Sequence, residues 1–176
     1  MADDLPEPAM PGLAVLPAAV LTGITPDDPK TVGNGTARKA IGMLLATDPR
    51  YRLPTGKERQ ALLVGFARRG KTLIGNGYDV VRVDGELDLT DDTAIAEAFD
   101  RITICEIKSS NRNDLKSGFG GYLFNITGAE QQTAQCLGSQ YRIVFVNTVT
   151  GEHQEMSFTE VLGRAKAFYP AWHIRL

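Results

Sequence analysis

The chain has 176 residues, a formal net charge of −2 and an isoelectric point near 5.7. That length fits one domain with a single core of helices packed on a sheet. The weakly acidic balance argues against a protein that coats nucleic acid through net charge alone, because such domains usually carry a strong basic excess. A local basic patch is compatible with this composition.

The N-terminal segment is rich in proline. Six of the nine prolines fall within the first 30 residues, among acids and small residues. This composition resists regular structure, so residues 1–32 are expected to form an extended arm and residues 33–176 a single domain. The apolar run in the arm is short and broken by Pro17, without a basic segment before it. We therefore expect a cytoplasmic protein that does not associate with a membrane, in which Cys105 and Cys136 are reduced thiols.

Helical and strand patterns alternate along the rest of the chain. Residues 36–47 place apolar side chains on one helical face and stop before Pro49. Capping-box pairs predict three further helices, over about 56–74 (Thr55 with Glu58), 128–137 (Thr127 with Glu130) and 158–169 (Ser157 with Glu160). Runs of β-branched residues predict strands over 78–83, 101–109 and 141–148, with weaker strand candidates at 152–158 and 173–176.

Two charges interrupt the apolar strand "RITICEIKSS", which spans residues 101–110. Ile102, Ile104, Glu106 and Lys108 share one face of this strand, because successive side chains alternate between the two faces. The acid and the base therefore cluster where the strand leaves the core. Such a pair is either an ordinary surface ion pair or the working end of an active site.

The surroundings of this pair resemble the core of the PD-(D/E)XK nuclease superfamily, the restriction-endonuclease-like fold. The matching order covers roughly residues 56–148: a helix, a strand ending at Val83, an aspartate-rich hairpin over 84–92, a strand ending in Glu106-Ile107-Lys108, a helix and a strand. The resemblance implies an α/β fold with a restriction-endonuclease-like core, a mixed central β-sheet flanked by helices.

The resemblance also implies a role for each residue of the tripeptide. Glu106 and an acid near the preceding strand would hold Mg²⁺, for which Mn²⁺ is expected to substitute, and the backbone carbonyl of Ile107 would complete the metal shell. Lys108 would orient or deprotonate the attacking water and offset phosphate charge. These residue types suit that chemistry, because Mg²⁺ prefers oxygen ligands and the developing negative charge needs a nearby cation.

The second acid has several candidates, because six aspartates lie between residues 79 and 100. Asp100 lies on the same strand as Glu106 and would be roughly 20 Å away at about 3.3 Å per residue, too far to share one ion. Asp88 has an apolar residue on each side and is expected on an antiparallel strand, opposite Glu106 across a hairpin. We therefore favour Asp88 as the catalytic and metal-binding acid, with Asp84 as the alternative. Neither follows a proline, which departs from the family's written motif.

Polar residues outside the tripeptide supply further candidates. The glycine-rich segment after it carries cations and amides that suit phosphates and base edges, which predicts DNA contacts from Asn111, Arg112, Asn113 and Lys116. Glu58 and Gln131, the latter followed by Gln132, match helical places where some members of the superfamily put a polar residue at the metal site. The capping boxes give Glu58 and Glu130 a sufficient structural role.

The resemblance therefore predicts a magnesium-dependent endonuclease that hydrolyses phosphodiester bonds in double-stranded DNA, such as a restriction enzyme of a restriction-modification system or another defence nuclease. One active site per chain implies a homodimer, or two successive nicks, for cutting both strands. Two alternatives stay open. One is a non-catalytic nucleic-acid-binding or assembly module with a nuclease-like fold. The other is a structure-specific nuclease such as a junction resolvase, a class that tends to be more basic.

Overall fold

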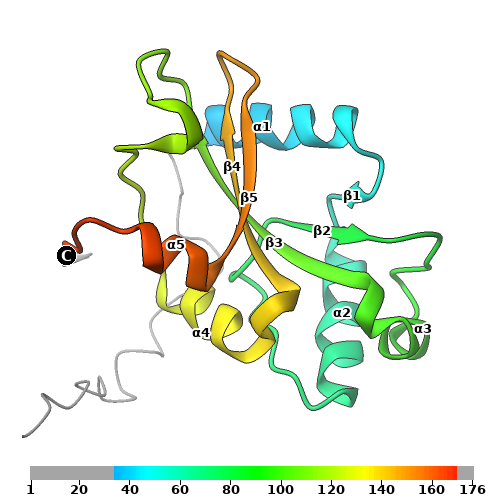
Figure 1. The fold of residues 1–176 in the computed structure, drawn as a ribbon. Helices are drawn as coiled ribbons and strands as arrows, with labels where there is room; N and C mark the ends of the chain where they lie inside the picture. Colours follow the sequence, from blue (N-terminus) through cyan, green and yellow to red (C-terminus); the bar gives the residue numbers. More distant parts are fainter. Residues whose placement is uncertain (1–33, 170–176) are drawn as a thin grey trace, which may run out of the picture. The chain divides into compact units, whose positions relative to one another are not determined.

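The computed structural model describes residues 34–169, so the expected N-terminal arm and the strand candidate at 173–176 lie outside the described residues. Within residues 34–169 the chain has an α/β fold, in which five strands form one mixed sheet in the order β1–β2–β3–β4–β5 with helices on both faces (Figure 1). The predicted α/β class with a mixed, helix-flanked sheet is confirmed. No helix in this part of the chain combines the length and the apolar character that crossing a bilayer requires.

Among the five described strands, one pairing is parallel and the other three are antiparallel. β3 and β4 pair in parallel, whereas β1 with β2, β2 with β3 and β4 with β5 pair antiparallel. A parallel pair needs a crossover connection, and α4 lies in the one between β3 and β4. The strands are β1 (Tyr51–Arg52), β2 (Val80–Val83), β3 (Ile102–Ser110), β4 (Tyr141–Asn147) and β5 (His153–Ser157). The helices are α1 (Asn34–Thr47), α2 (Gly56–Arg68), α3 (Asp92–Glu97), α4 (Gly128–Leu137) and α5 (Phe158–Arg164).

Three helices begin at the predicted capping boxes. In α2, α4 and α5 the Thr or Ser hydroxyl accepts a hydrogen bond from the backbone N–H of the Glu three residues later, and the Glu carboxylate accepts one from the backbone N–H of the cap residue. These reciprocal bonds satisfy amide groups that the first helical turn leaves without a partner. The local sequence therefore determines where these helices begin.

Two helices end earlier than predicted. The prediction for α2 ran to residue 74, but the helix ends at Arg68 because Gly70 takes a φ of 68° and its amide bonds back to the Ala67 carbonyl at 2.9 Å. Helix α5 ends at Arg164, and the chain is irregular from there to residue 169.

The aspartate-rich stretch at 84–92 is a loop that leads into the first residue of α3, and not the predicted strand hairpin. Asp91 caps α3, since its carboxylate accepts from the amides of Thr93 at 2.8 Å and Ala94 at 3.1 Å. Asp91 therefore starts a helix at this point, and helix formation takes the place of the predicted strand. β2 and β3 still pair antiparallel, but this loop, α3 and a 3₁₀ turn at 99–101 connect them.

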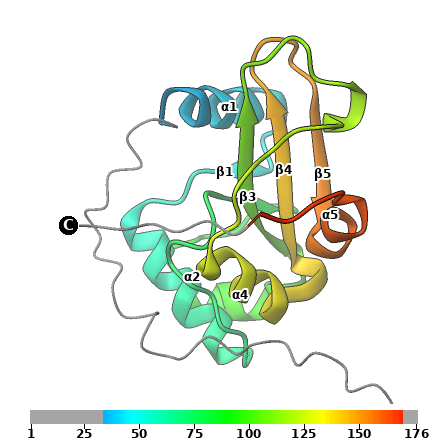
Figure 2. The ribbon, with the colours of Figure 1, turned by 90° about the vertical axis from the view of Figure 1, so that its left-hand side faces the viewer.

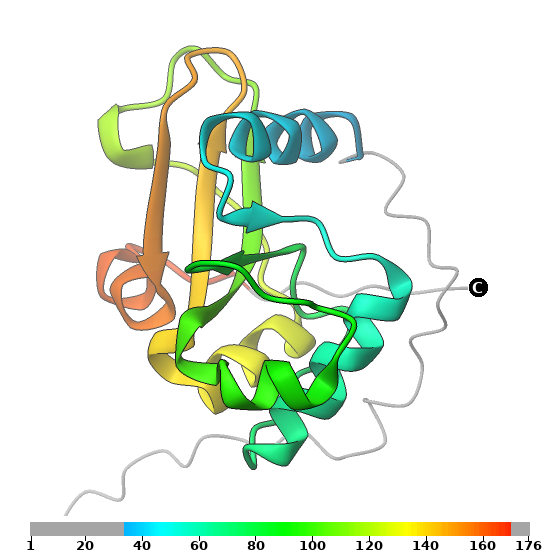
Figure 3. The ribbon, with the colours of Figure 1, turned by 90° about the vertical axis from the view of Figure 1, so that its right-hand side faces the viewer.

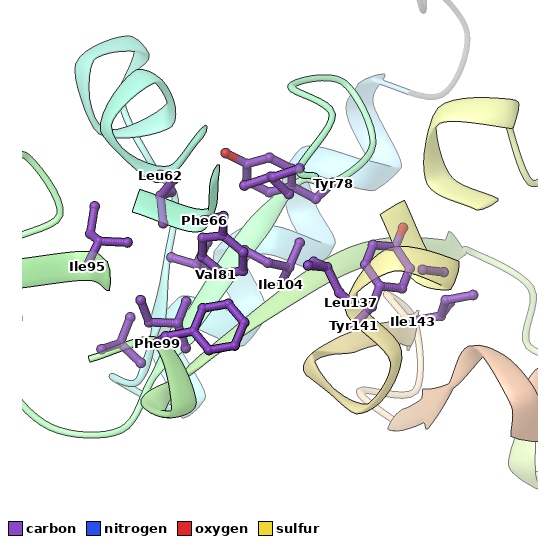
Figure 4. Close-up of a cluster of buried hydrophobic side chains, with 14 of the residues drawn as sticks. Leu62, Phe66, Tyr78, Val81, Ile95, Phe99, Ile104, Leu137, Tyr141 and Ile143 are labelled. Atoms are coloured by element: carbon purple, nitrogen blue, oxygen red, sulfur yellow. The ribbon is translucent and has the colours of Figure 1, made fainter. Parts of the chain in front are cut away.

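The sheet separates two apolar layers. Helix α1 crosses the strands on one face (Figure 3), where Ala40 and Leu44 pack with Val80, Cys105, Ile107, Val144 and Val146. Helices α2 and α4 lie on the opposite face (Figure 2), over a core that includes Leu62, Phe66, Val81, Ile104, Leu137, Tyr141 and Ile143. Figure 4 shows Ile104 of β3 between side chains of α2 and Tyr141 of β4. β3 is therefore buried on both faces, and any charge on it is enclosed by protein. Cys105 and Cys136 are both free thiols, as expected.

Candidate functional site

Glu106 and Lys108 of β3 face α4, which contributes a second carboxylate to the pair. The Lys108 ammonium donates to Glu106 Oε1 at 2.9 Å and to Glu130 Oε2 at 2.7 Å. Glu106 and Glu130 are each 3% exposed, and the Lys108 side chain is 11% exposed. Buried charges are costly unless they are paired, so this cluster differs from a solvated surface ion pair, and that simpler interpretation of the sequence is wrong.

Asp79 is the acid that lies opposite Glu106. The antiparallel register pairs Val80 with Cys105, so the residue just before β2 is level with Glu106 and points to the same face of the sheet. Two hydrogen bonds hold Asp79 there. Its amide donates to the Cys105 carbonyl at 3.0 Å, and its Oδ2 accepts from the Ile107 amide at 3.0 Å. Asp79, Glu106, Lys108 and Glu130 therefore gather at one place although three different elements carry them.

The expectation that Asp88 lies opposite Glu106 is wrong. Asp88 is exposed in the loop after β2, where its Oδ1 accepts from the amide of Thr90 at 2.8 Å and from the Thr90 hydroxyl at 2.7 Å. These bonds lower the pKa of Asp88. The physical reason for its distance from the site is the direction of the strands, because residues after Val83 run toward the start of β3 and away from Glu106.

Asp84, the alternative acid, also lies away from Glu106. Its amide donates to the Arg101 carbonyl at 2.9 Å, which places it beside the first residues of β3. Its carboxylate lies 3.4 Å from the Arg50 guanidinium, and both side chains are more than half exposed. Asp84 thus forms a surface pair at the opposite end of the β2–β3 ladder.

The carboxylates of the site interact strongly with one another. Burial, together with the charges of Asp79 and Glu130, raises the pKa of Glu106 to about 8 against the opposing effect of Lys108. Burial acts to lower the pKa of Lys108, but Glu106 and Glu130 outweigh burial and raise it. Glu106 and Glu130 therefore share the Lys108 ammonium, and with Asp79 nearby the site holds more acid than base.

Arg59 bonds to the turn that carries Asp79, and Gly77 lets this turn approach α4; neither residue was among the candidates predicted from the sequence. The Arg59 guanidinium donates to the carbonyls of Gly75 and Tyr78, each at 3.3 Å, and of Asp79 at 2.8 Å. Gly77 passes so close to α4 that a Cβ there would lie 2.8 Å from the Ala129 carbonyl oxygen. The available sequence signal was the Gly75-Asn76-Gly77 turn, which delivers an aspartate to the start of a strand.

The predicted DNA-contacting residues lie in the segment between β3 and α4. Asn111, Arg112, Asn113 and Lys116 are all exposed, and Arg112 forms an ion pair with Asp114 at 2.8 Å. The same segment returns across the sheet (Figure 2) and packs Phe119, Tyr122 and Phe124 around Phe145, which is the register partner of Lys108. It thereby encloses the Lys108 side of the site.

Neither additional helical candidate lies at the tripeptide. Glu58 is engaged in the capping box of α2, where its carboxylate accepts from the Thr55 amide at 2.7 Å. Gln131 and Gln132 are exposed. Glu130 is a cap residue of α4, as predicted from the sequence, and it is also the α4 side chain that reaches Lys108.

No protein-family model, no curated protein and no solved structure matches the chain.

The donor chemistry of the site suits a hard divalent cation. Asp79 and Glu106 offer carboxylate oxygens on one face of the sheet, and the site has an excess of acid that a cation would neutralise. Within residues 34–169, no three His, Cys, Asp or Glu side chains are gathered into a ready-made ligand group. In the described arrangement the Lys108 ammonium lies against Glu106 and Glu130 and supplies the positive charge.

Proposed function

We propose that the chain is a metal-dependent endonuclease that hydrolyses phosphodiester bonds in double-stranded DNA, with a PD-(D/E)XK-type site made of Asp79, Glu106 and Lys108. The observation that carries the proposal is the register of β2 against β3, which sets an acid beside Glu106-Ile107-Lys108 on one face of the sheet. This acid precedes the tripeptide by one strand, as the superfamily motif requires, although it is a different aspartate from the one favoured on sequence.

The order of the elements supports the same proposal. Along the chain come a helix (α2), a strand (β2), the strand that bears the tripeptide (β3), a crossover helix (α4) and a strand parallel to β3 (β4). This is the order from which a restriction-endonuclease-like core is proposed. The short helix α3 is an addition between β2 and β3. The tripeptide lies on β3, and apolar layers cover both faces of the sheet there.

Each residue of the proposed site has a distinct role. Asp79 and Glu106 would hold Mg²⁺ or Mn²⁺, and the Ile107 carbonyl is proposed as a further oxygen ligand. When bound, the cation would supply a Lewis acid and a water of lowered pKa. Lys108 would place its ammonium beside the phosphate, where negative charge develops as the phosphodiester is attacked. The raised pKa of Lys108 supports this role, because it keeps the ammonium charged despite burial.

Binding of the substrate is proposed to involve the exposed segment after β3. Asn111, Arg112, Asn113 and Lys116 follow the tripeptide directly and are open to solvent, so their cations and amides are available to phosphates or base edges. Because one chain carries one such site, cleavage of both strands calls for a homodimer or for two successive nicks. A restriction or other defence nuclease is the role we favour.

The direct test is incubation of the protein with plasmid and phage DNA, with and without Mg²⁺. We expect cleavage that requires the metal, with discrete fragments if the enzyme is site-specific. Lys108→Ala should abolish cleavage while the protein stays folded, and Lys57→Ala, an exposed lysine on α2, should leave it unchanged. Full activity in Lys108→Ala would overturn the assignment. Absence of cleavage and of metal binding in the wild type would favour the non-catalytic binding module.

A further inference from the structure

Glu130 stands apart from the two other acids that occupy the same position of a capping box. Glu58, Glu130 and Glu160 each accept a hydrogen bond from the backbone of their cap residue, so all three have the same local role. Glu58 is half-buried and Glu160 is exposed, whereas Glu130 is 3% exposed. An acid that needs only to cap a helix has no reason to be enclosed, because enclosure makes its charge costly.

The enclosed carboxylate serves the helix and the site with a single oxygen. Glu130 Oε2 accepts from the Thr127 amide at 3.1 Å and from the Lys108 ammonium at 2.7 Å. The first bond fixes the carboxylate to the start of α4, and the second joins α4 to the middle of β3. Lys108 is thereby held between Glu130 on the helix and Glu106 on its own strand.

We propose that Glu130 is a positioning residue, which holds the Lys108 ammonium against Glu106 and ties it to the start of α4. A lysine side chain has a flexible four-carbon stem, so its ammonium would otherwise sample many positions. Two charge-assisted hydrogen bonds, to Glu106 on β3 and to Glu130 on α4, restrict the ammonium to one position. The capping box holds the Glu130 carboxylate where it can accept the second bond. The consequence for cleavage rests on the proposed nuclease function, but the holding of Lys108 does not.

The variant that isolates this role is Glu130→Gln. Glutamine also serves in capping boxes, so the helix start is kept while the negative charge beside Lys108 is lost. The matched control is Glu160→Gln, the same change in the capping box of α5. A second variant, Thr127→Ala, weakens the cap and keeps the carboxylate.

The readout is the rate at which an N-hydroxysuccinimide acetate reagent acetylates Lys108, measured by mass spectrometry with exposed Lys116 as the internal reference. We expect Glu130→Gln to raise this rate about tenfold, as the loss of a charge-assisted bond implies, and Glu160→Gln to leave it unchanged. Thr127→Ala should keep Lys108 largely protected. The proposal would be overturned if the acetylation rate of Lys108 were unchanged in Glu130→Gln. It would also be overturned if Thr127→Ala raised this rate as much as Glu130→Gln does.

A cleavage assay on the same variants separates this inference from the proposed function. If the wild type cleaves DNA, Glu130→Gln should lower the rate and change its pH profile, and Glu160→Gln should do neither. If the wild type does not cleave while Lys108 protection still depends on Glu130, the nuclease proposal fails and the positioning role stands. If the wild type cleaves DNA and the protection of Lys108 does not depend on Glu130, the positioning role fails and the nuclease proposal stands.

Discussion

Asp79 and Ile107 are joined across the sheet by a hydrogen bond in which Asp79 Oδ2 accepts the Ile107 amide at 3.0 Å. The bond attaches the residue before β2 to the middle of the Glu106-Ile107-Lys108 tripeptide. It fixes the separation of two acids that come from different strands. The candidate site is therefore part of the sheet itself, and its geometry should respond to any change that moves the start of β2.

The pKa of Glu106 predicts how stability depends on pH. A carboxyl whose pKa is about 8 in the folded state, against about 4.5 when unfolded, keeps its proton in the native protein while the unfolded chain loses it. The free energy of unfolding should therefore fall as pH rises from 5 to 8, by on the order of 3 kcal/mol from this group. Glu106→Gln should remove that fall and be at least as stable as the wild type at pH 8.5.

Urea denaturation at pH 5.5, 7.0 and 8.5 measures this dependence. Glu86→Gln is the control, because that carboxylate lies exposed in the loop after β2. If the free energy of unfolding differs between Glu106→Gln and the wild type by the same amount at all three pH values, the buried carboxyl does not titrate as described.

Gly77 should not tolerate a side chain. A Cβ at this position would lie 2.6 Å from Thr133 Oγ1 and 2.8 Å from the Ala129 carbonyl oxygen, and the carbonyl belongs to the backbone of α4 and cannot give way. We expect Gly77→Ala to cost about 1–3 kcal/mol of stability. Gly42→Ala makes the matched comparison, because that glycine lies inside α1 with open space around it and should gain about 0.5–1 kcal/mol. Thermal denaturation of both variants gives the sign of each change.

Arg59 should stabilise the turn that carries Asp79. Its guanidinium donates to three carbonyls between Gly75 and Asp79 and lies 4.5 Å from the centre of the Tyr78 ring. Arg59→Ala removes these bonds and is expected to cost about 2 kcal/mol. It should also speed hydrogen exchange of the Ile107 amide, whose acceptor is Asp79. Lys57→Ala, on the exposed side of the same helix, should change neither quantity, and equal exchange rates at Ile107 in both variants would contradict this role for Arg59.

The sequence predicts the local parts of the fold well. Three capping boxes place the starts of α2, α4 and α5, and β-branched runs place β2, β3 and β4, because caps and strand patterns depend on residues close in the chain. The predicted helix over 56–74 ran past the true end of α2, although Gly70 already follows two arginines there. α3 was missed because Asp91 was interpreted as part of a hairpin and not as a cap.

The candidate site depends on strand register, which the sequence does not specify. Glu106 and Lys108 were found because the alternation within one strand is local. Their neighbours Asp79 and Glu130 lie just before β2 and on α4, and only the antiparallel ladder and the crossover helix bring them together. Asp79 is adjacent to an apolar strand and resembles a strand-start residue, while Glu130 already had an explanation as a cap.

Calorimetric titration with Mn²⁺, in the wild type and in two aspartate variants, decides whether Asp79 or Asp88 is the metal-binding acid. Asp79 is level with Glu106 across β2 and β3, whereas Asp88 is bonded to Thr90 in an exposed loop. We expect the wild type and Asp88→Asn to bind Mn²⁺ with equal affinity, and Asp79→Asn to bind at least about tenfold more weakly, since it loses a charged oxygen ligand. If Mn²⁺ binding survives in Asp79→Asn and disappears in Asp88→Asn, or if the wild type binds no Mn²⁺, Asp79 and Glu106 do not form the proposed metal site.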